Sequence, residues 1–164
     1  MLTLYLVRHA KAEPLAETDN ARELADQGIK DAKNLGKLFG HMLVQPDAIY
    51  CSTAKRTKQT LSLMQEAGLS CGNIQYDDDI YHASADLIIE KLHKAETKNV
   101  MIIGHNPAMA ILLNRLADEQ DVAPSMLHFP TGSLAQIHFS GDKFQDLEFQ
   151  ASGKVVSFLK GADI

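Results

Sequence analysis

An arginine and a histidine stand side by side where an apolar run near the start of the chain ends. Residues 2–7 are LTLYLV, and Arg8 and His9 follow directly. A second arginine, Arg56, and a second histidine, His105, each come shortly after another apolar run. Arginine presents a planar fork of N–H donors that matches phosphate oxygens. Neutral imidazole is a nucleophile near pH 7 and can accept a phosphoryl group. These residues therefore favour phosphoryl chemistry with a histidine nucleophile.

The two arginines and the two histidines would have separate roles in such a site. His9 would take the phosphoryl group, while Arg8 and Arg56 would bind the oxygens that are not transferred and stabilise their charge in the transition state. We expect Arg56 in the first turn of a helix and His105 just before another. The free N–H groups and positive dipole end of a helix start favour anions, so both positions suit phosphate.

A cysteine offers a competing nucleophile. Residues 51–56 are CSTAKR, so the spacing from Cys51 to Arg56 is C-x4-R. Cysteine-dependent phosphatases have the pattern C-x5-R, in which the loop surrounds three phosphate oxygens. The loop here is one residue shorter, and it has no glycine that would ease a tight bend. We therefore interpret Cys51 as a small buried strand residue.

The usual signatures of metal and nucleotide sites are missing. No HExxH or CxxC motif occurs, and there is no GxxxxGK[ST] loop. A metal phosphoesterase that uses His9, His105 and the aspartates at 77–79 is an alternative, although the spacing typical of metal ligands is absent. We expect neither a metal nor a cofactor.

The composition is typical of a globular chain. Of 164 residues, 45% are hydrophobic and 23% are charged, and we expect one domain over residues 1–164. The net charge of −5 argues against a nucleic-acid or anionic-membrane surface. We find no membrane-spanning apolar run and no signal peptide, and two cysteines are too few for a disulfide scaffold. We expect a cytoplasmic protein and favour a monomer.

Three apolar runs precede the candidate residues and have the pattern of buried strands. The runs are residues 2–7, 47–51 and 100–104. Amphipathic segments alternate with them, which predicts an α/β fold: a three-layer αβα sandwich with a mostly parallel central sheet. Because ligands bind beyond the carboxyl ends of parallel strands, we expect the residues that follow the three runs to meet at one edge of the sheet. These residues are Arg8 and His9, Ser52 and Arg56, and His105.

Cap residues set the expected helix bounds. They are Asp26 for a helix through residue 42, Ser52 or Thr53 for a helix that stops at Gly68, Ser84 for a third, and Asn106 with Pro107 for a fourth. The remaining segments are expected to be extended near 74–81, irregular over 117–132, strands near 133–139 and 144–150, and an apolar tail at 155–159.

Three ordered stretches resemble the histidine phosphatase superfamily, which has the phosphoglycerate mutase-like fold. They are VRHA at 7–10, STAKRTKQT at 52–60 and IGHNPAM at 103–109. The family motif is Arg-His-Gly after the first strand, S-x-x-x-R-x-x-Q-T at the second helix and a later Gly-His, and here alanine replaces the first glycine. The stretches RHAKAE, RELADQG at 22–28 and IYHAS at 80–84 most resemble the small SixA-type phosphohistidine phosphatases.

The resemblance implies a role for each matching residue. His9 would be phosphorylated, Arg8 and Arg56 would bind phosphate oxygens, and His105 would hydrogen-bond the phosphate. Arg22 matches an arginine that also reaches the site in phosphohistidine phosphatases. The expected lining of the rim is Ser52, Asn106 and the backbone of residues 131–133.

The family comparison also bears on the substrate. Larger members supply a glutamate as general acid after the third strand, whereas residues 77–82 are DDDIYH, with no clear match. We interpret the three aspartates as a solvated turn, with an acid among them as the alternative. Imidazole protonates near neutral pH and leaves well, whereas an alkoxide needs a proton. The short chain also leaves little room for a lid over the site. These features favour phosphohistidine on a phosphorelay or phosphotransfer protein as the substrate.

Two other functions stay open. One is a small phosphomonoesterase of the same fold that acts on small-molecule phosphate esters. The other is a phospholigand-binding module without catalysis, although a binder has no need of the nucleophile His9.

Overall fold

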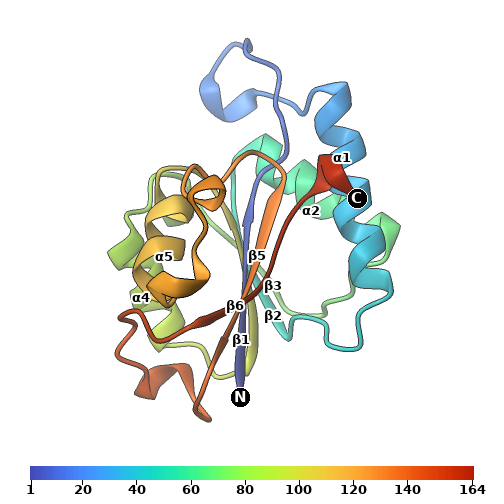
Figure 1. The fold of residues 1–164 in the computed structure, drawn as a ribbon. Coiled ribbons are helices and arrows are strands. Elements are labelled where there is room, and N and C mark those ends of the chain that lie inside the picture. The colour runs from blue at the N-terminus through green and yellow to red at the C-terminus, as the bar shows by residue number, and fades with distance from the viewer.

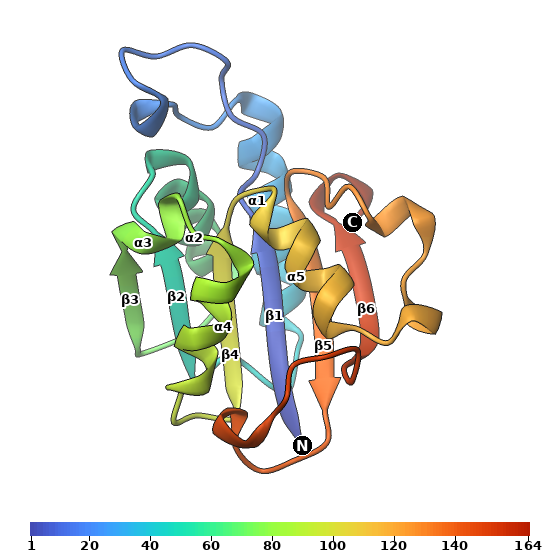
Figure 2. The same ribbon diagram turned by 90° about the vertical axis from the view of Figure 1, so that its left-hand side faces the viewer.

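A six-stranded sheet forms the centre of the protein in the computed structural model, which describes residues 1–164. The strands lie in the order β3-β2-β4-β1-β5-β6 (Figure 2). Pairs among β1, β2, β3 and β4 are parallel, and β5 is antiparallel to β1 and β6. The predicted, mostly parallel sheet is confirmed. The strands are β1 (Leu2–Arg8), β2 (Ala48–Ser52), β3 (Ile74–Asp77), β4 (Asn99–Gly104), β5 (Ser133–Phe139) and β6 (Lys154–Lys160).

Helices cover both faces of the sheet, which confirms the predicted three-layer sandwich. Helices α1 and α2 lie on one face and α4 and α5 on the other (Figure 1). A single helical turn, α3, follows β3. The helices are α1 (Asp26–Gly40), α2 (Lys55–Ala67), α3 (Asp78–Tyr81), α4 (Ala85–His93) and α5 (Ala108–Leu116). None of them combines the length and apolar character that a membrane crossing requires.

Strand β1 contributes to the core on both faces because its successive side chains point in opposite directions. Leu4 and Leu6 belong to the cluster beneath α4 and α5, whereas Tyr5 and Val7 belong to the cluster beneath α1 and α2. All of these side chains are fully buried. A strand that is covered on both sides favours apolar residues on both faces, which explains why every residue of LTLYLV except the buried Thr3 is apolar.

Two predictions near the C-terminus are wrong. Residues 144–150 do not form a strand, because Phe144–Asp146 is a 3-10 turn and an irregular segment follows. Phe144 and Phe149 are buried against Phe139, so their apolar character reflects core packing. The expected apolar tail at 155–159 lies inside β6, which pairs with β5.

The expected caps of the first two helices are also wrong. Ala25 and Ala54 occupy the cap positions of α1 and α2, and neither makes a side-chain cap. Ser52 lies at the end of β2, where its Oγ pairs with His105 at 2.7 Å instead of capping α2. Asp26 lies in the first turn of α1, where its charge favours the helix dipole.

Later boundaries are closer to expectation. Ser84 caps α4 by accepting from the Leu87 N–H, and Gly68 ends α2. The segment expected to be extended over 74–81 is extended only to Asp77. Helix α5 begins one residue after Pro107, and the Asn106 side chain accepts from Ala110 N at 3.2 Å.

Candidate active site

The carboxyl ends of β1, β2 and β4 bring the predicted residues to one edge of the sheet. Arg8 is the last residue of β1 and pairs with Gly104 at the end of β4. The next residue, His9, donates its backbone N–H to the Gly104 carbonyl at 3.1 Å. His105 follows β4, and its ring centroid lies 5.2 Å from that of His9. The parallel register therefore fixes the distance between the two imidazoles.

The His9 ring is buried and held in one tautomer. Its Nδ1 lies 2.8 Å from the Ala10 carbonyl oxygen, which can only accept, so Nδ1 carries the proton. The Ala10 N–H in turn donates to Thr60 Oγ1 of α2 at 3.0 Å, which anchors this turn of backbone. The remaining ring nitrogen, Nε2, has its lone pair free for a substrate.

The surroundings of His9 keep its ring neutral. Burial is the largest cause and lowers the pKa of His9 to about 4, although the hydrogen bond to Ala10 opposes the shift. The positive charges of Arg56, Arg8 and Arg22 lower this pKa further. Because His9 is buried, with 6% of the residue exposed, and its ring is uncharged at pH 7, Nε2 is a base and a nucleophile.

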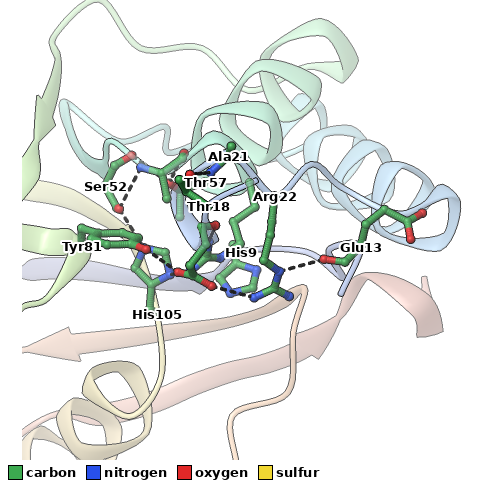
Figure 3. Close-up of polar contacts among 12 residues, drawn as sticks. His9, Glu13, Thr18, Ala21, Arg22, Ser52, Thr57, Tyr81 and His105 are labelled. Carbon is green, nitrogen blue, oxygen red and sulfur yellow. Dashed lines mark hydrogen bonds and ion pairs between the residues drawn. The ribbon is translucent and has the colours of Figure 1, made fainter. Parts of the chain in front are cut away.

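His105 is fixed through both ring nitrogens, and Figure 3 shows its contact with Ser52. Its Nδ1 lies 3.3 Å from Arg56 Nη2, which can only donate, so Nδ1 accepts. Its Nε2 therefore carries the proton and donates to Ser52 Oγ at 2.7 Å. Burial, followed by His9 and Arg56, lowers the pKa of His105 to about 3. The ring is neutral at pH 7.

The guanidinium groups of Arg8 and Arg56 belong to this site, and each keeps a hydrogen-bond donor that has no partner. Arg8 donates from Nη1 to the Phe129 carbonyl at 3.1 Å, and Arg56 donates from Nη1 to the Asp19 carbonyl at 2.8 Å. The Nε–H groups of both arginines are buried without a partner. Unpartnered buried donors are costly, and a cationic pair of them is suited to an anion.

Arg22 lies in the loop that joins β1 to α1. Its Nε donates to the Glu13 carbonyl at 2.7 Å, and its Nη1 donates to Asp19 Oδ1 at 3.1 Å (Figure 3 shows Arg22 beside His9). The structure thus places Arg22 in the same network as Arg56, with Asp19 between them.

Asp19 and Tyr81 are site residues that sequence reasoning missed. The Tyr81 hydroxyl donates to the Asp19 carboxylate, and the Tyr81 ring meets His105 edge-on at 5.4 Å. The Arg56 guanidinium lies 5.7 Å from the centre of the Tyr81 ring. The i,i+3 spacing of Asp19 and Arg22, which allows an ion pair, was an available signal for Asp19, and the IYHAS stretch was one for Tyr81.

The predicted rim residues mainly hold backbone in place. Asn106 donates through Nδ2 to the His128 carbonyl at 2.7 Å and to the Phe129 carbonyl at 3.2 Å. Gly132 donates its N–H to the His9 carbonyl at 2.9 Å. Ser52 is fully buried beneath His105.

The alternative groups lie in other surroundings. Cys51 is fully buried, and burial raises the pKa of its thiol to about 12, so it is not a thiolate at pH 7. Asp77 and Asp79 form ion pairs with Lys91, and Asp78 accepts from the Thr53 hydroxyl. No three His, Cys, Asp or Glu side chains gather closely enough to hold a metal ion.

Comparison with known proteins points to one family. A family model described as the histidine phosphatase superfamily (branch 1) matches residues 4–84. The uncharacterized protein Rv1276c of Mycobacterium tuberculosis is 30% identical over 82% of this chain and 88% of its own length.

Two solved structures are similar over nearly the whole chain, and both are provisionally named phosphohistidine phosphatase SixA. The protein from Agrobacterium tumefaciens is 30% identical, with a TM-score of 0.76 over 96% of this chain and 97% of its own. The protein from Nakamurella multipartitia is 28% identical, with a TM-score of 0.80 over 96% and 95%.

Proposed function

Because the chain belongs to the histidine phosphatase superfamily, we propose that it is a metal-independent phosphatase that works through a phosphohistidine intermediate at His9. One observation carries this proposal. A buried, neutral imidazole presents a free Nε2 beside Arg8 and Arg56, whose Nε–H groups have no partner. A nucleophile and two unused cationic donors are what phosphoryl transfer to a side chain requires.

The first step transfers the phosphoryl group to the enzyme. Arg8 and Arg56 bind the oxygens that are not transferred, and His9 Nε2 attacks phosphorus on the side opposite the leaving group. The bond from phosphorus to the leaving group breaks, the leaving group keeps the electron pair and takes up a proton, and a bond from phosphorus to Nε2 forms. The hydrogen bond from Nδ1–H to the Ala10 carbonyl stabilises the charge that the ring then gains.

The second step returns the enzyme to its starting state. Water attacks the phosphorus of phospho-His9, the bond from phosphorus to Nε2 breaks, and inorganic phosphate leaves. His105 lies beside this group, and we assign it to hydrogen bonding of the phosphate oxygens. Such a bond uses a ring nitrogen that now pairs with Arg56 or Ser52, so phosphate binding exchanges one of these contacts.

For the substrate, we propose phosphohistidine on a phosphorelay or phosphotransfer protein. The leaving imidazole accepts a proton near neutral pH, so the step does not depend on a strong general acid. The carboxylates of residues 77–79 are engaged with Lys91 and Thr53, which leaves the leaving group without an evident acid there. The SixA names of two similar structures support the same choice.

We also propose that residues 1–164 act as one domain in the cytoplasm. The site residues follow strands β1, β2 and β4, which all belong to the single sheet of the chain. Both cysteines are free, which suits a reducing compartment.

A direct comparison of substrates tests this function. The protein is given a phosphohistidine protein and a panel of small phosphate esters, each with and without a chelator. We expect faster release of phosphate from the phosphohistidine protein and no effect of the chelator. A clear preference for an ester would instead favour a small phosphomonoesterase, and binding without turnover would favour a phospholigand-binding module. Loss of activity with the chelator would contradict metal independence.

A further inference from the structure

The Asp19 side chain occupies donors that the proposed function gives to the substrate phosphate. Its Oδ1 accepts from Arg22 Nη1 at 3.1 Å, and its Oδ2 accepts from Arg56 Nη2 at 3.2 Å. The Tyr81 hydroxyl also donates to Oδ2. One carboxylate thus bridges two arginines and a tyrosine from three separate parts of the chain.

This carboxylate is an anion that resembles one edge of a phosphate group. Hydrogen bonds from Tyr81 and Arg22 hold the pKa of Asp19 well below its usual range, so it is charged at pH 7. Asp19 accepts only from the terminal Nη nitrogens of Arg22 and Arg56. The Nε–H groups of Arg8 and Arg56 stay without partners. A phosphate has more oxygens than a carboxylate and carries more charge, so it can satisfy both sets.

Asp19 is far easier to move than the arginine it contacts. Its side chain is 55% exposed, whereas that of Arg56 is 7% exposed. It lies on the short turn Asp19–Ala21, in a loop that extends beyond the sheet edge (Figure 2). The base of the loop is pinned by the hydrogen bond from Glu13 N–H to the Glu23 carbonyl at 2.8 Å. Because the carboxylate is itself half exposed, water can solvate it when it leaves the arginines, which lowers the cost of displacing it.

We propose that Asp19 is a positioning residue that competes with phosphate for Arg22 and Arg56. In the anion-free protein it holds both guanidinium groups toward the site. An arriving phosphoryl group repels the carboxylate and takes over its donors, and the carboxylate returns as inorganic phosphate leaves. This inference rests on the proposed function, because it assigns the same arginines to phosphate, and it adds how product release is assisted.

The change in phosphate affinity when Asp19 is replaced distinguishes a competitor from a residue that only supports the site. A residue that only supports the arginines would weaken phosphate binding when removed, whereas a competitor would strengthen it. Calorimetric titration with inorganic phosphate is carried out on the full chain in a buffer without other anions. We expect Asp19→Asn to bind phosphate about fivefold more tightly than the wild type. Tyr81→Phe removes one donor to Asp19, and we expect a smaller tightening.

A matched variant controls for the change in charge. Asp78→Asn removes an exposed carboxylate near the same edge, where its partner is Thr53 and not an arginine. We expect its phosphate affinity to equal that of the wild type. Tightening in Asp78→Asn equal to that in Asp19→Asn would overturn the inference, since net charge alone would explain both. Weaker or unchanged binding in Asp19→Asn would overturn it too.

The titration needs no turnover, so its outcome is separate from that of the proposed function. Tighter binding in Asp19→Asn supports the inference even if no phosphorylated substrate is hydrolysed. If the wild type is active while Asp19→Asn binds phosphate no more tightly, the inference alone fails. In the active enzyme, we expect inhibition by phosphate to strengthen in Asp19→Asn by the same factor as binding.

Discussion

His9 depends on its surroundings to be a nucleophile at neutral pH. An exposed histidine has a pKa near 6.5 and is partly protonated in mildly acidic solution. Here burial, assisted by three arginines, lowers the pKa of His9 to about 4. The ring therefore keeps its Nε2 lone pair over the whole physiological range.

The protonation state of His9 can be measured directly. NMR titration of the imidazole rings, with the His9 signals assigned by their loss in His9→Asn, should show a ring that stays neutral down to about pH 5. The reason is that the charged form would be desolvated and placed beside cations. A His9 ring that titrates near pH 6.5 would contradict this description of the site.

Arg56 tests the assignment of the cationic donors. Lysine keeps the charge but lacks the planar fork, so it cannot offer two phosphate oxygens the paired donors that Arg56 can. We expect Arg56→Lys to lower kcat/KM by about a hundredfold, with an unchanged circular dichroism spectrum. Arg115→Lys is the control, because Arg115 pairs with Asp86 away from the site. An equal loss in both variants would contradict the assignment.

The sequence was informative about residues that stand directly after strands. Arg8, His9 and His105 could be placed together because parallel strands end at one edge. Asp19 and Tyr81 could not, because 62 positions separate these hydrogen-bonded residues and each has the character of a surface residue when taken alone. Their pairing depends on the path of the loop that carries Asp19 and on the placement of the single turn α3, which ends at Tyr81, and neither segment has a periodic pattern.

The turn before β5 is hydrogen-bonded to the backbone of Arg8 and His9. Gly132 has a φ of 69°, a left-handed conformation that favours glycine. Its N–H donates to the carbonyls of Arg8 and His9 at 3.2 and 2.9 Å. The conformation of this one glycine thus ties the end of β1 to the start of β5.

Substitution of Gly132 should therefore cost stability. Alanine would be strained at this φ, and its Cβ would lie 3.3 Å from that of Asp31. We expect Gly132→Ala to lower the free energy of unfolding by about 1–2 kcal/mol, measured by urea denaturation. Gly72→Ala is the matched control, since nothing lies within 4 Å of an added Cβ there. Equal stability of the two variants would rule out the strain.

Element prediction succeeded where burial and pairing coincide. The apolar runs of β1 and β4 are buried strands, as their composition indicates. The segment 144–150 contains the apolar residues Phe144, Leu147 and Phe149, but Phe144 and Phe149 pack into the core without pairing to a strand. An apolar sequence pattern indicates that a segment is buried. The segment forms a strand only when a neighbouring strand has a free edge with which it can pair. Here β6 takes the edge beside β5.

At the scale of the whole molecule, two buried neutral histidines link stability to pH. In the unfolded chain His9 and His105 would have pKa values near 6.5, whereas in the folded protein they are about 4 and about 3. Between pH 6.5 and about 4 the unfolded state therefore binds protons that the folded state does not. Their contribution is fully present above pH 6.5 and decreases as the pH falls.

We therefore expect the free energy of unfolding to fall from pH 7 to pH 5. The loss should be smaller in His9→Asn, because that variant removes one of the two titrating groups; the difference should be about 1 kcal/mol per pH unit. Urea denaturation at a series of pH values measures both proteins. Parallel pH profiles for the wild type and His9→Asn would show that His9 is not buried in its neutral form.

The layers also determine what surrounds the site. The sheet and helices hold Arg8, His9 and His105 at one edge, and the connection from β1 to α1, which carries Asp19 and Arg22, extends beyond that edge. Residues 1–164 place no helical layer over that edge (Figure 2). This arrangement suits a phosphorylated side chain presented on the surface of another protein.

The most direct test of the central claim is to trap the phosphoenzyme. The protein is mixed with a 32P-labelled phosphohistidine protein, quenched in alkali within milliseconds, and digested for mass spectrometry. We predict label on His9 that survives alkali and is lost in acid, and no label in His9→Ala. Acid-stable label on another residue, or unchanged turnover in His9→Ala, would contradict a phosphohistidine intermediate at His9.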